Sequence, residues 1–269
     1  MIIFALGVLG LIIGSFLNVV VLRKGARSLT GRSGCMSCGY ALHWFDLIPV
    51  VSWLALRGRC RKCGSRISVQ YPLVEASTAV LFALIGLWIT PAFFHIGIWP
   101  LFVTYLGICA LLIAIAAYDF LHTIIPDAWA YSFAVLAFVS QLLTPLPNDF
   151  PWAQFFFAGP IAAFPLFLLW FVSGGRWMGL GDAKLALGIG WLLGYPTGLI
   201  AVMLSFILGT VILLPLMFAE RAITHMRGFG EASSGLTMKS EVPFGPFLIL
   251  ACLLFWFAKL YGVQLPLPF

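Results

Sequence analysis

The chain has 269 residues, of which 62% are hydrophobic and 9% are charged, and its formal net charge is +6. Soluble domains are about 45–50% apolar and about 25% charged, so this composition excludes an ordinary soluble globular protein. The apolar residues also come in long blocks, which is typical of helices that cross a membrane.

Eight apolar blocks predict transmembrane helices, so the expected fold class is an all-α, polytopic membrane protein. The blocks cover residues 3–22, 72–90, 97–117, 128–143, 153–173, 183–194, 197–218 and 244–262. The sixth is short for a bilayer crossing, so we expect it to tilt, to thin the membrane locally or to lie among its neighbours. The first is interpreted as a retained helix, because its basic residues follow the apolar run.

The positions of Lys and Arg predict the orientation of the chain, because cytoplasmic loops are enriched in these residues. If the N-terminus lies outside, all but Lys259 of the 15 Lys and Arg residues fall on the cytoplasmic side. The positive charge is therefore interpreted as a topology signal that also suits contact with anionic lipid head groups. A nucleic-acid partner is not expected.

The longest polar stretch, residues 23–71, carries two C-x-x-C pairs separated by 21 residues. Two such pairs predict a tetrahedral site in which four thiolates hold a structural Zn²⁺ ion. Two disulfides or four free thiols are the alternatives, and a reducing cytoplasm disfavours the disulfides. The predicted ligands are Cys35, Cys38, Cys60 and Cys63.

Three of the nine acidic residues lie where a carboxylate is costly, at the ends of apolar blocks. Asp119 ends the third block, Asp127 precedes the fourth, and Asp182 precedes the sixth. In the predicted topology Asp119 and Asp182 both reach the cytoplasmic membrane face, where they could meet at one depth. Asp127 is expected to cap the fourth helix or to support the other two.

A close pair of carboxylates can share one proton, so that one acts as a base toward water while the other polarises a carbonyl group. Gly179 and Gly181 would let a substrate backbone approach Asp182 closely. Alternatively, each aspartate caps a helix or pairs with a basic residue, and Lys184 is a ready partner for Asp182. Composition and spacing leave an aspartyl protease and an ion-coupled transporter with a zinc-stabilised module both open.

Sequence motifs favour the protease. Residues 179–182 read Gly-Leu-Gly-Asp, which resembles the G-x-G-D signature of polytopic aspartyl proteases. Within that group the chain resembles the prepilin peptidases, or type IV leader peptidases, over nearly its whole length. The resemblance rests on residues 14–20, both cysteine pairs, and residues 49–53, 71–75, 125–127 and 243–247. Presenilin-like proteases are the closest competing family, but they lack the cysteine segment.

This resemblance implies that Asp119 and Asp182 are the catalytic pair. It implies a first transmembrane helix at 1–22, a cytoplasmic zinc-binding, methyltransferase-associated segment at 23–71 and a transmembrane peptidase domain at 72–269. The expected reaction removes short basic leaders from type IV prepilins and type II secretion pseudopilins at the cytoplasmic face of the bacterial inner membrane. N-methylation of the new N-terminus with S-adenosylmethionine is also implied, and a pilus-assembly scaffold is the non-enzymatic alternative.

Other charged residues have roles that the sequence leaves open. Glu75 either binds the leader or S-adenosylmethionine, or pairs with Arg66 or Lys62. Lys184 either tunes the aspartate pair or holds a lipid phosphate. Because the leader and the cytoplasmic face are both basic, we expect local acidic groups such as Glu75 and Asp46, together with the substrate's apolar helix, to dominate recognition.

Overall fold

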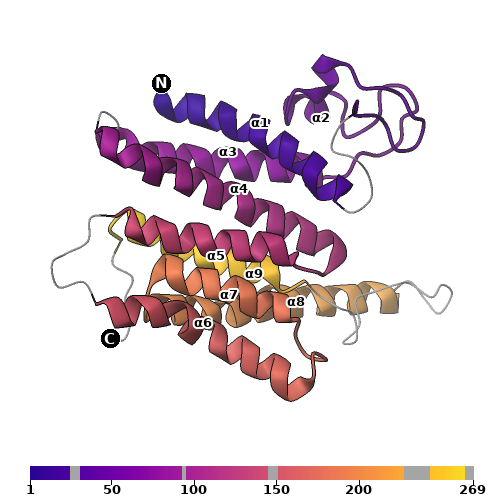
Figure 1. Ribbon diagram of the computed structural model, residues 1–269. Helices are drawn as coiled ribbons and strands as arrows, with labels where there is room; N and C mark the ends of the chain where they lie inside the picture. Colours follow the sequence, from indigo (N-terminus) through magenta and orange to yellow (C-terminus); the bar gives the residue numbers. More distant parts are fainter. Residues whose placement is uncertain (25–30, 93–94, 145–150, 227–242, 264–269) are drawn as a thin grey trace. The chain divides into compact units, whose positions relative to one another are not determined.

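The computed structural model describes residues 1–24, 31–92, 95–144, 151–226 and 243–263, and the chain is helical along most of them (Figure 1). Short 3₁₀ turns are labelled η. The elements are α1 (Ile2–Arg23), η1 (Trp44–Leu47), α2 (Val51–Ala55), α3 (Gln70–Ile89), η2 (Thr90–Ala92), η3 (Ile96–Ile98), α4 (Trp99–His122), α5 (Asp127–Leu142), α6 (Trp152–Ser173), α7 (Leu180–Leu193), α8 (Thr197–Met226) and α9 (Gly245–Leu260).

Each of the eight apolar blocks coincides with a helix, which confirms the all-α membrane fold. Five helices in the described part of the chain are long and apolar enough to cross a bilayer: α1, α3, α4, α6 and the part of α8 up to Pro215. The helices α5, α7 and α9 have 16, 14 and 16 residues, fewer than the roughly 20 that a perpendicular crossing requires. Eight crossings therefore stay a prediction.

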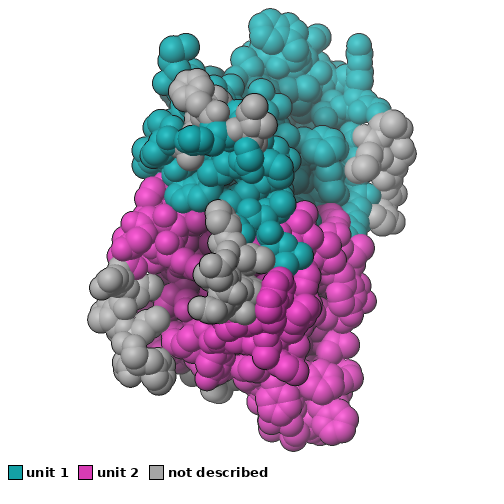
Figure 2. Space-filling model, turned by 60° about the vertical axis from the view of Figure 1, so that its left-hand side comes forward, with its two compact units in different colours: residues 1–118, 142–145 teal, residues 119–141, 146–269 magenta. Residues whose placement is uncertain are grey.

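The chain divides into two compact units, coloured separately in Figure 2. Unit 1 comprises residues 1–118 and 142–145, and unit 2 comprises residues 119–141 and 146–269. The division falls inside α4, between Tyr118 and Asp119. The predicted functional boundary between residues 71 and 72 is a different kind of division, because α3 and the part of α4 up to Tyr118 belong to unit 1 together with α1.

Glycines bring α1 and α3 together in unit 1. A Cβ atom at Gly10 would lie 2.6 Å from the Cα of Ala79, and one at Gly14 would lie 2.7 Å from the Cα of Glu75. Small residues four apart let two membrane helices pack backbone to backbone. This close packing places the buried carboxyl group of Glu75 against α1.

Unit 2 is organised around α7, of which nine of the 14 residues are buried. Its C-terminal carbonyl groups have partners from two other helices. Gln141 of α5 donates to the carbonyl oxygen of Leu192 at 2.7 Å, and Lys259 of α9 donates to that of Leu193 at 3.2 Å. A lysine at a helix C-terminus also complements the helix dipole. These bonds let a short helix end among its neighbours, as expected for the sixth block.

Candidate functional site

The two cysteine pairs of unit 1 fold into matching turns. In the first, the Cys35 amide donates to the carbonyl of Tyr40 at 2.9 Å, and in the second the Cys60 amide donates to that of Ser65 at 2.8 Å. The first turn closes at Gly39, whose φ angle is 68°, and the second closes at Gly64, whose φ angle is 69°. A positive φ angle suits glycine, and the tight turn that it allows brings both thiols of a pair to one side.

The four predicted thiol ligands converge, with all sulfur atoms within 4.8 Å of one another. Cys35 Sγ and Cys63 Sγ, from different pairs, are 3.8 Å apart. A tetrahedron with Zn–S bonds of about 2.3 Å has edges of about 3.8 Å, whereas a disulfide requires about 2.05 Å. All four cysteines are free. The cluster therefore fits one tetrahedral metal ion and excludes the disulfide alternative.

Ser65 helps to keep two of these cysteines as thiolates. Its Oγ atom lies 3.1 Å from Cys63 Sγ and 3.5 Å from Cys35 Sγ. Hydrogen bonding with Ser65, together with the backbone of Cys38 and Ser37, lowers the pKa of Cys35 to about 5, and Ser65 also lowers the pKa of Cys63. The pKa of Cys38 is instead raised, to about 11, by burial and by its neighbouring thiols, so the effect is confined to Cys35 and Cys63. Since a thiolate rather than a thiol binds a metal, this environment favours metal binding.

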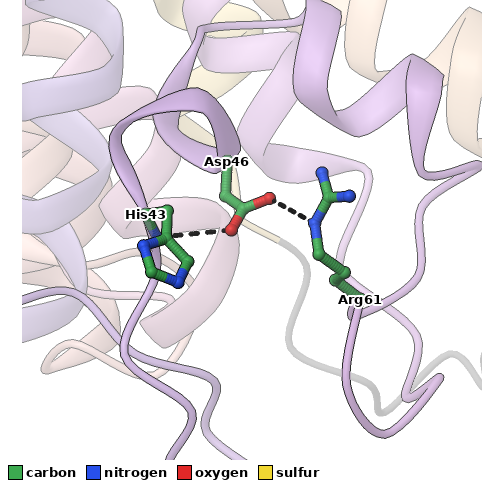
Figure 3. A network of polar contacts seen from close by, with 3 residues as sticks. All are labelled: His43, Asp46 and Arg61. Carbon is green, nitrogen blue, oxygen red and sulfur yellow. Dashed lines mark hydrogen bonds and ion pairs between the residues drawn. The ribbon is translucent and has the colours of Figure 1, made fainter.

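Asp46, suggested above as a partner for a basic leader, is already engaged (Figure 3). One carboxylate oxygen pairs with Arg61 Nε at 2.9 Å, and the other accepts the His43 amide at 3.3 Å. The Asp46 side chain is only 1% exposed. That suggestion is wrong for this conformation, because Asp46 ties η1 to the second cysteine turn instead.

Glu75 of α3 accepts the amide of Val50 at 2.7 Å, and it is also hydrogen-bonded by Ser15 of α1. The expected alternative, an ion pair with Arg66 or Lys62, is wrong, because the ion pairs among the described residues are Arg61–Asp46 and Lys184–Asp127. Glu75 therefore joins α1, α3 and the cysteine segment.

Asp119 lies in unit 2, three residues before the end of α4, and it is 4% exposed. Its Oδ2 atom accepts the amide of Gly245, the first residue of α9, at 3.0 Å. A Cβ atom at Gly245 would lie 2.7 Å from that oxygen. Only glycine therefore allows the amide to approach the carboxylate in this way.

Asp182 is the third residue of α7, and it is 9% exposed. The expected role as the helix N-cap is wrong, because Gly179 occupies the N-cap position. The Asp182 carboxylate instead receives a hydrogen bond from the backbone of Gly179. An acidic residue at this position of a helix can satisfy the N-cap amide, as in a capping box.

Both aspartates converge on the segment between α4 and α5. Ile125 in that segment lies 2.9 Å from where a Cβ of Gly181 would stand, and 3.3 Å from where a Cβ of Gly245 would stand. Asp119 and Asp182 are near enough for their charges to repel each other. The structure thus brings the predicted pair together in one unit, with glycines on both flanking helices making room.

Lys184 pairs with Asp127 rather than with Asp182. The Nζ atom of Lys184 lies 2.6 Å from an Asp127 oxygen, and it also lies over the ring of Tyr131 at 5.4 Å. Asp127 begins α5, and the carbonyl of Pro126 accepts the first helical amides. The predicted ion pair between Lys184 and Asp182 is therefore wrong. The prediction that the Asp127 carboxylate caps the helix of the fourth apolar block, which is α5, is also wrong.

Sequence reasoning missed three functional contacts. Gly245 stood in a quoted motif, but its bond to Asp119 joins residues 126 positions apart. Ser65 follows the second cysteine pair and gave no separate signal. Asn18 of α1 is 2% exposed and donates to the Tyr71 carbonyl at 3.1 Å. A polar residue inside an apolar block was the available signal for Asn18.

Comparisons with protein families match both parts of the chain. The model of the Bacterial Peptidase A24 N-terminal domain matches residues 8–89, and that of the Type IV leader peptidase family matches residues 106–214. The second match contains Asp119 and Asp182, and the first contains the four clustered cysteines.

Several curated relatives bear the name prepilin leader peptidase/N-methyltransferase. The Pseudomonas putida protein is 30% identical over 285 residues, 96% of this chain and 90% of its own. The Pseudomonas aeruginosa protein is 30% identical over 289 residues, 96% and 89%. The Myxococcus xanthus protein is 56% identical over 77 residues, 28% and 23%. No solved structure matches. With identity of 30% sustained along nearly its whole length, the chain belongs to the type IV leader peptidase family.

Proposed function

We propose that this protein is an aspartic endopeptidase that cleaves the leader of prepilins, with Asp119 and Asp182 as its catalytic pair. The observation that carries the proposal is the convergence of two buried carboxyl groups on one loop of unit 2, each held by a backbone amide from a glycine. Buried ionisable groups at a membrane boundary are costly, and a catalytic role explains why two are kept together.

The chemistry needs one proton on the pair. Two adjacent carboxyl groups share a proton because ionising both would place like charges side by side. The ionised carboxylate takes a proton from water, whose oxygen attacks the scissile carbonyl carbon. The protonated carboxyl group donates to the carbonyl oxygen, which gives a tetrahedral intermediate. The carboxyl group that took the proton from water then gives it to the amine as the C–N bond breaks, and the hydroxyl proton of the intermediate returns to the other carboxylate.

The substrates we propose are type IV prepilins and type II secretion pseudopilins, whose short basic leaders precede an apolar helix. The site would lie at the cytoplasmic face of the bacterial inner membrane, following the distribution of Lys and Arg. Arg27, Arg227 and Lys239, which contribute to that distribution, lie outside the described residues. The carboxylates of Asp46 and Glu75 already have partners within the protein. We therefore propose that the substrate's apolar helix and the aspartate pair contribute most to substrate binding.

The second activity we propose is N-methylation of the new N-terminal residue, with S-adenosylmethionine as donor. Its support is the name shared by the relatives. Glu75 was the candidate that the sequence offered for the donor, but its carboxylate is bonded to Val50 and Ser15. The Glu75 carboxylate is thus already occupied by groups of the protein, which argues against Glu75 as the donor site. The tetrathiolate cluster supports Zn²⁺ as its ion, in a structural role.

Intact mass measurement of a prepilin separates the two activities. Purified protein in lipid vesicles is incubated with prepilin, with and without S-adenosylmethionine. Cleavage removes the mass of the leader, and methylation adds a methyl group only when the donor is present. Asp119→Asn and Asp182→Asn should each abolish cleavage, because an amide can neither take nor donate the required proton.

Asp127→Asn is the matched control, since Asp127 lies next to the same loop but is 65% exposed. It should keep cleavage. Full cleavage by Asp119→Asn or by Asp182→Asn, with unchanged folding, would overturn the proposed catalytic pair. Pilus assembly by those variants without any cleavage would instead support the scaffold role.

A further inference from the structure

The stretch 44–54 presents large apolar side chains to its surroundings although it lies within the most basic segment of the chain. Trp44, Val51 and Leu54 are 77%, 58% and 61% exposed. We call this set the 44–54 apolar face, and its members are Trp44, Leu47, Ile48, Val51 and Leu54, all of them exposed. An exposed cluster of this kind marks a surface that is covered by a partner or by lipid.

The charged side chain of this stretch, Asp46, is not part of the apolar face. Asp46 is buried and bonded to Arg61 on the second cysteine turn. Trp53 is also turned inward, where its indole N–H donates to the carbonyl of Ile67 at 3.3 Å, and its ring lies against Gly58. The segment is therefore amphipathic, with one side on the cysteine module and the other side uncovered.

The bond between Glu75 and Val50 sets the depth of this face. Glu75 is five residues inside α3, about 7.5 Å along the helix axis from its start. Ser15, which shares the same carboxyl group, is eight residues before the end of α1, about 12 Å along that helix. Both positions fall inside the predicted membrane blocks. If those blocks cross the membrane as predicted, the bond to Glu75 holds the backbone at Val50 at the membrane boundary.

The surroundings of Val50 continue the lipid-facing surface of unit 1. Leu73, two residues before Glu75 in α3, is 60% exposed, and Phe16, next to Ser15 in α1, is 55% exposed, so apolar side chains are exposed at about the same depth along both helices. Arg57 and Arg59, exposed and just beyond α2, supply positive charge next to the apolar face. Apolar and aromatic residues with adjacent basic ones are typical of segments that lie in a membrane interface.

We propose that the 44–54 apolar face is a membrane-interface anchor, inserted among the head groups and upper acyl chains of an anionic bilayer. It would hold the metal-binding module flat on the membrane through two attachments, the Glu75 bond inside and lipid outside. This inference does not depend on either proposed catalytic activity.

Photolabelling tests the proposal in vesicles of phosphatidylglycerol and phosphatidylcholine that contain a lipid with a diazirine on its acyl chain. The full-length protein is used as the Asp182→Asn variant, so that no catalytic step is involved. After irradiation, peptide mass spectrometry locates the label. Trp44 and Leu54 should be labelled from the acyl chain, whereas Trp53, the same residue type turned inward, should not be.

Further measurements test the role of the anionic head groups and the anchor itself. Replacing phosphatidylglycerol with phosphatidylcholine should reduce the labelling of Trp44, and equal labelling would overturn the role of anionic head groups. A label on Trp44 from a water-soluble diazirine, with none from the lipid, would overturn the anchor itself. Crosslinking of Trp44 to an added prepilin in place of lipid would also overturn it, and would assign the face to the substrate's helix.

Discussion

Each unit holds a buried carboxyl group that accepts a backbone amide from a distant part of the chain. In unit 1, Glu75 takes the amide of Val50 at 2.7 Å and has Ser15 as a second partner. In unit 2, Asp119 takes the amide of Gly245 at 3.0 Å, and its charged neighbour is another acid, Asp182. Burial alone does not distinguish the two. The neighbouring group does distinguish them. Hydrogen-bond donors surround Glu75, which acts as a clamp, whereas Asp119 has a second carboxyl group beside it, as the proposed proton-sharing pair requires.

The largest effect, a loss of order in the cysteine segment, is expected when the metal is lost. Removing the metal tests whether the Glu75 clamp can order this segment by itself. Cys60→Ser removes the buried ligand, and binding of structural Zn²⁺ is worth about 10–16 kcal/mol in zinc-finger peptides. Hydrogen exchange should show residues 35–65 losing protection while α7 and α9 keep theirs. Met36→Ala, an exposed site in the first cysteine turn, is the control. Retained protection in Cys60→Ser would mean that the clamp alone orders the segment.

The next largest effect is expected at Gly245, and it tests the pair in unit 2. Gly245→Ala places a methyl carbon 2.7 Å from Asp119 Oδ2, too close for the carboxylate to stay where it is, and alanine is otherwise well suited to a helix. Displacing a catalytic group by about 1 Å can cost about 100-fold, so kcat/KM for prepilin cleavage should fall by about that factor.

Gly209→Ala in α8 is the matched control, because its Cβ would make only ordinary contact with Phe247, at 3.6 Å. It should cleave like the unaltered protein. Normal cleavage by Gly245→Ala would contradict the proposal that Asp119 is catalytic. Asp119 would then have the same structural role in unit 2 that Glu75 has in unit 1.

A smaller effect is expected at Glu75, and it tests the clamp directly. Glu75→Ala leaves the Val50 amide without its acceptor, which costs about 1–3 kcal/mol, so exchange of that amide should speed up about 5- to 150-fold. Glu75→Gln keeps an acceptor oxygen and should exchange more slowly than Glu75→Ala. Cleavage should survive both changes, and its loss in Glu75→Gln would make Glu75 more than a clamp.

Each long helix in the described part of the chain could be predicted from the residues of its own segment. Apolar blocks place all eight long helices, and the sixth block, 183–194, corresponds to α7 at Leu180–Leu193. The short elements η1 and α2 were missed, because four- and five-residue turns leave no periodic pattern. The contacts that let a short α7 end inside unit 2 come from α5 and α9, and the sequence of α7 does not contain them.

The site was predicted in its residues but less well in its partners. Lys184 was matched with Asp182 because they are close in sequence, yet residues two apart on a helix face different directions and cannot pair. The true partner, Asp127, is 57 positions away. The clamp at Glu75 depends on Val50 adopting a φ of 60°, which is unusual for a β-branched residue and invisible to pattern reasoning. Such contacts are tertiary, so spacing alone does not reveal them.

The smallest effect is expected at the ion pair between Lys184 and Asp127, which follows the same loop as the proposed catalytic pair without belonging to that pair. Because Asp127 is 65% exposed, water screens the pair, and its coupling energy should not exceed about 1 kcal/mol. A double-mutant cycle with Asp127→Asn and Lys184→Met measures this coupling in the rate of cleavage. The expected reduction is about fivefold or less, since the pair only steadies the loop that carries Ile125. If Asp127→Asn instead abolishes cleavage, as Asp182→Asn should, the reactive group of unit 2 contains three acids, and a carboxyl group does not need burial to take part.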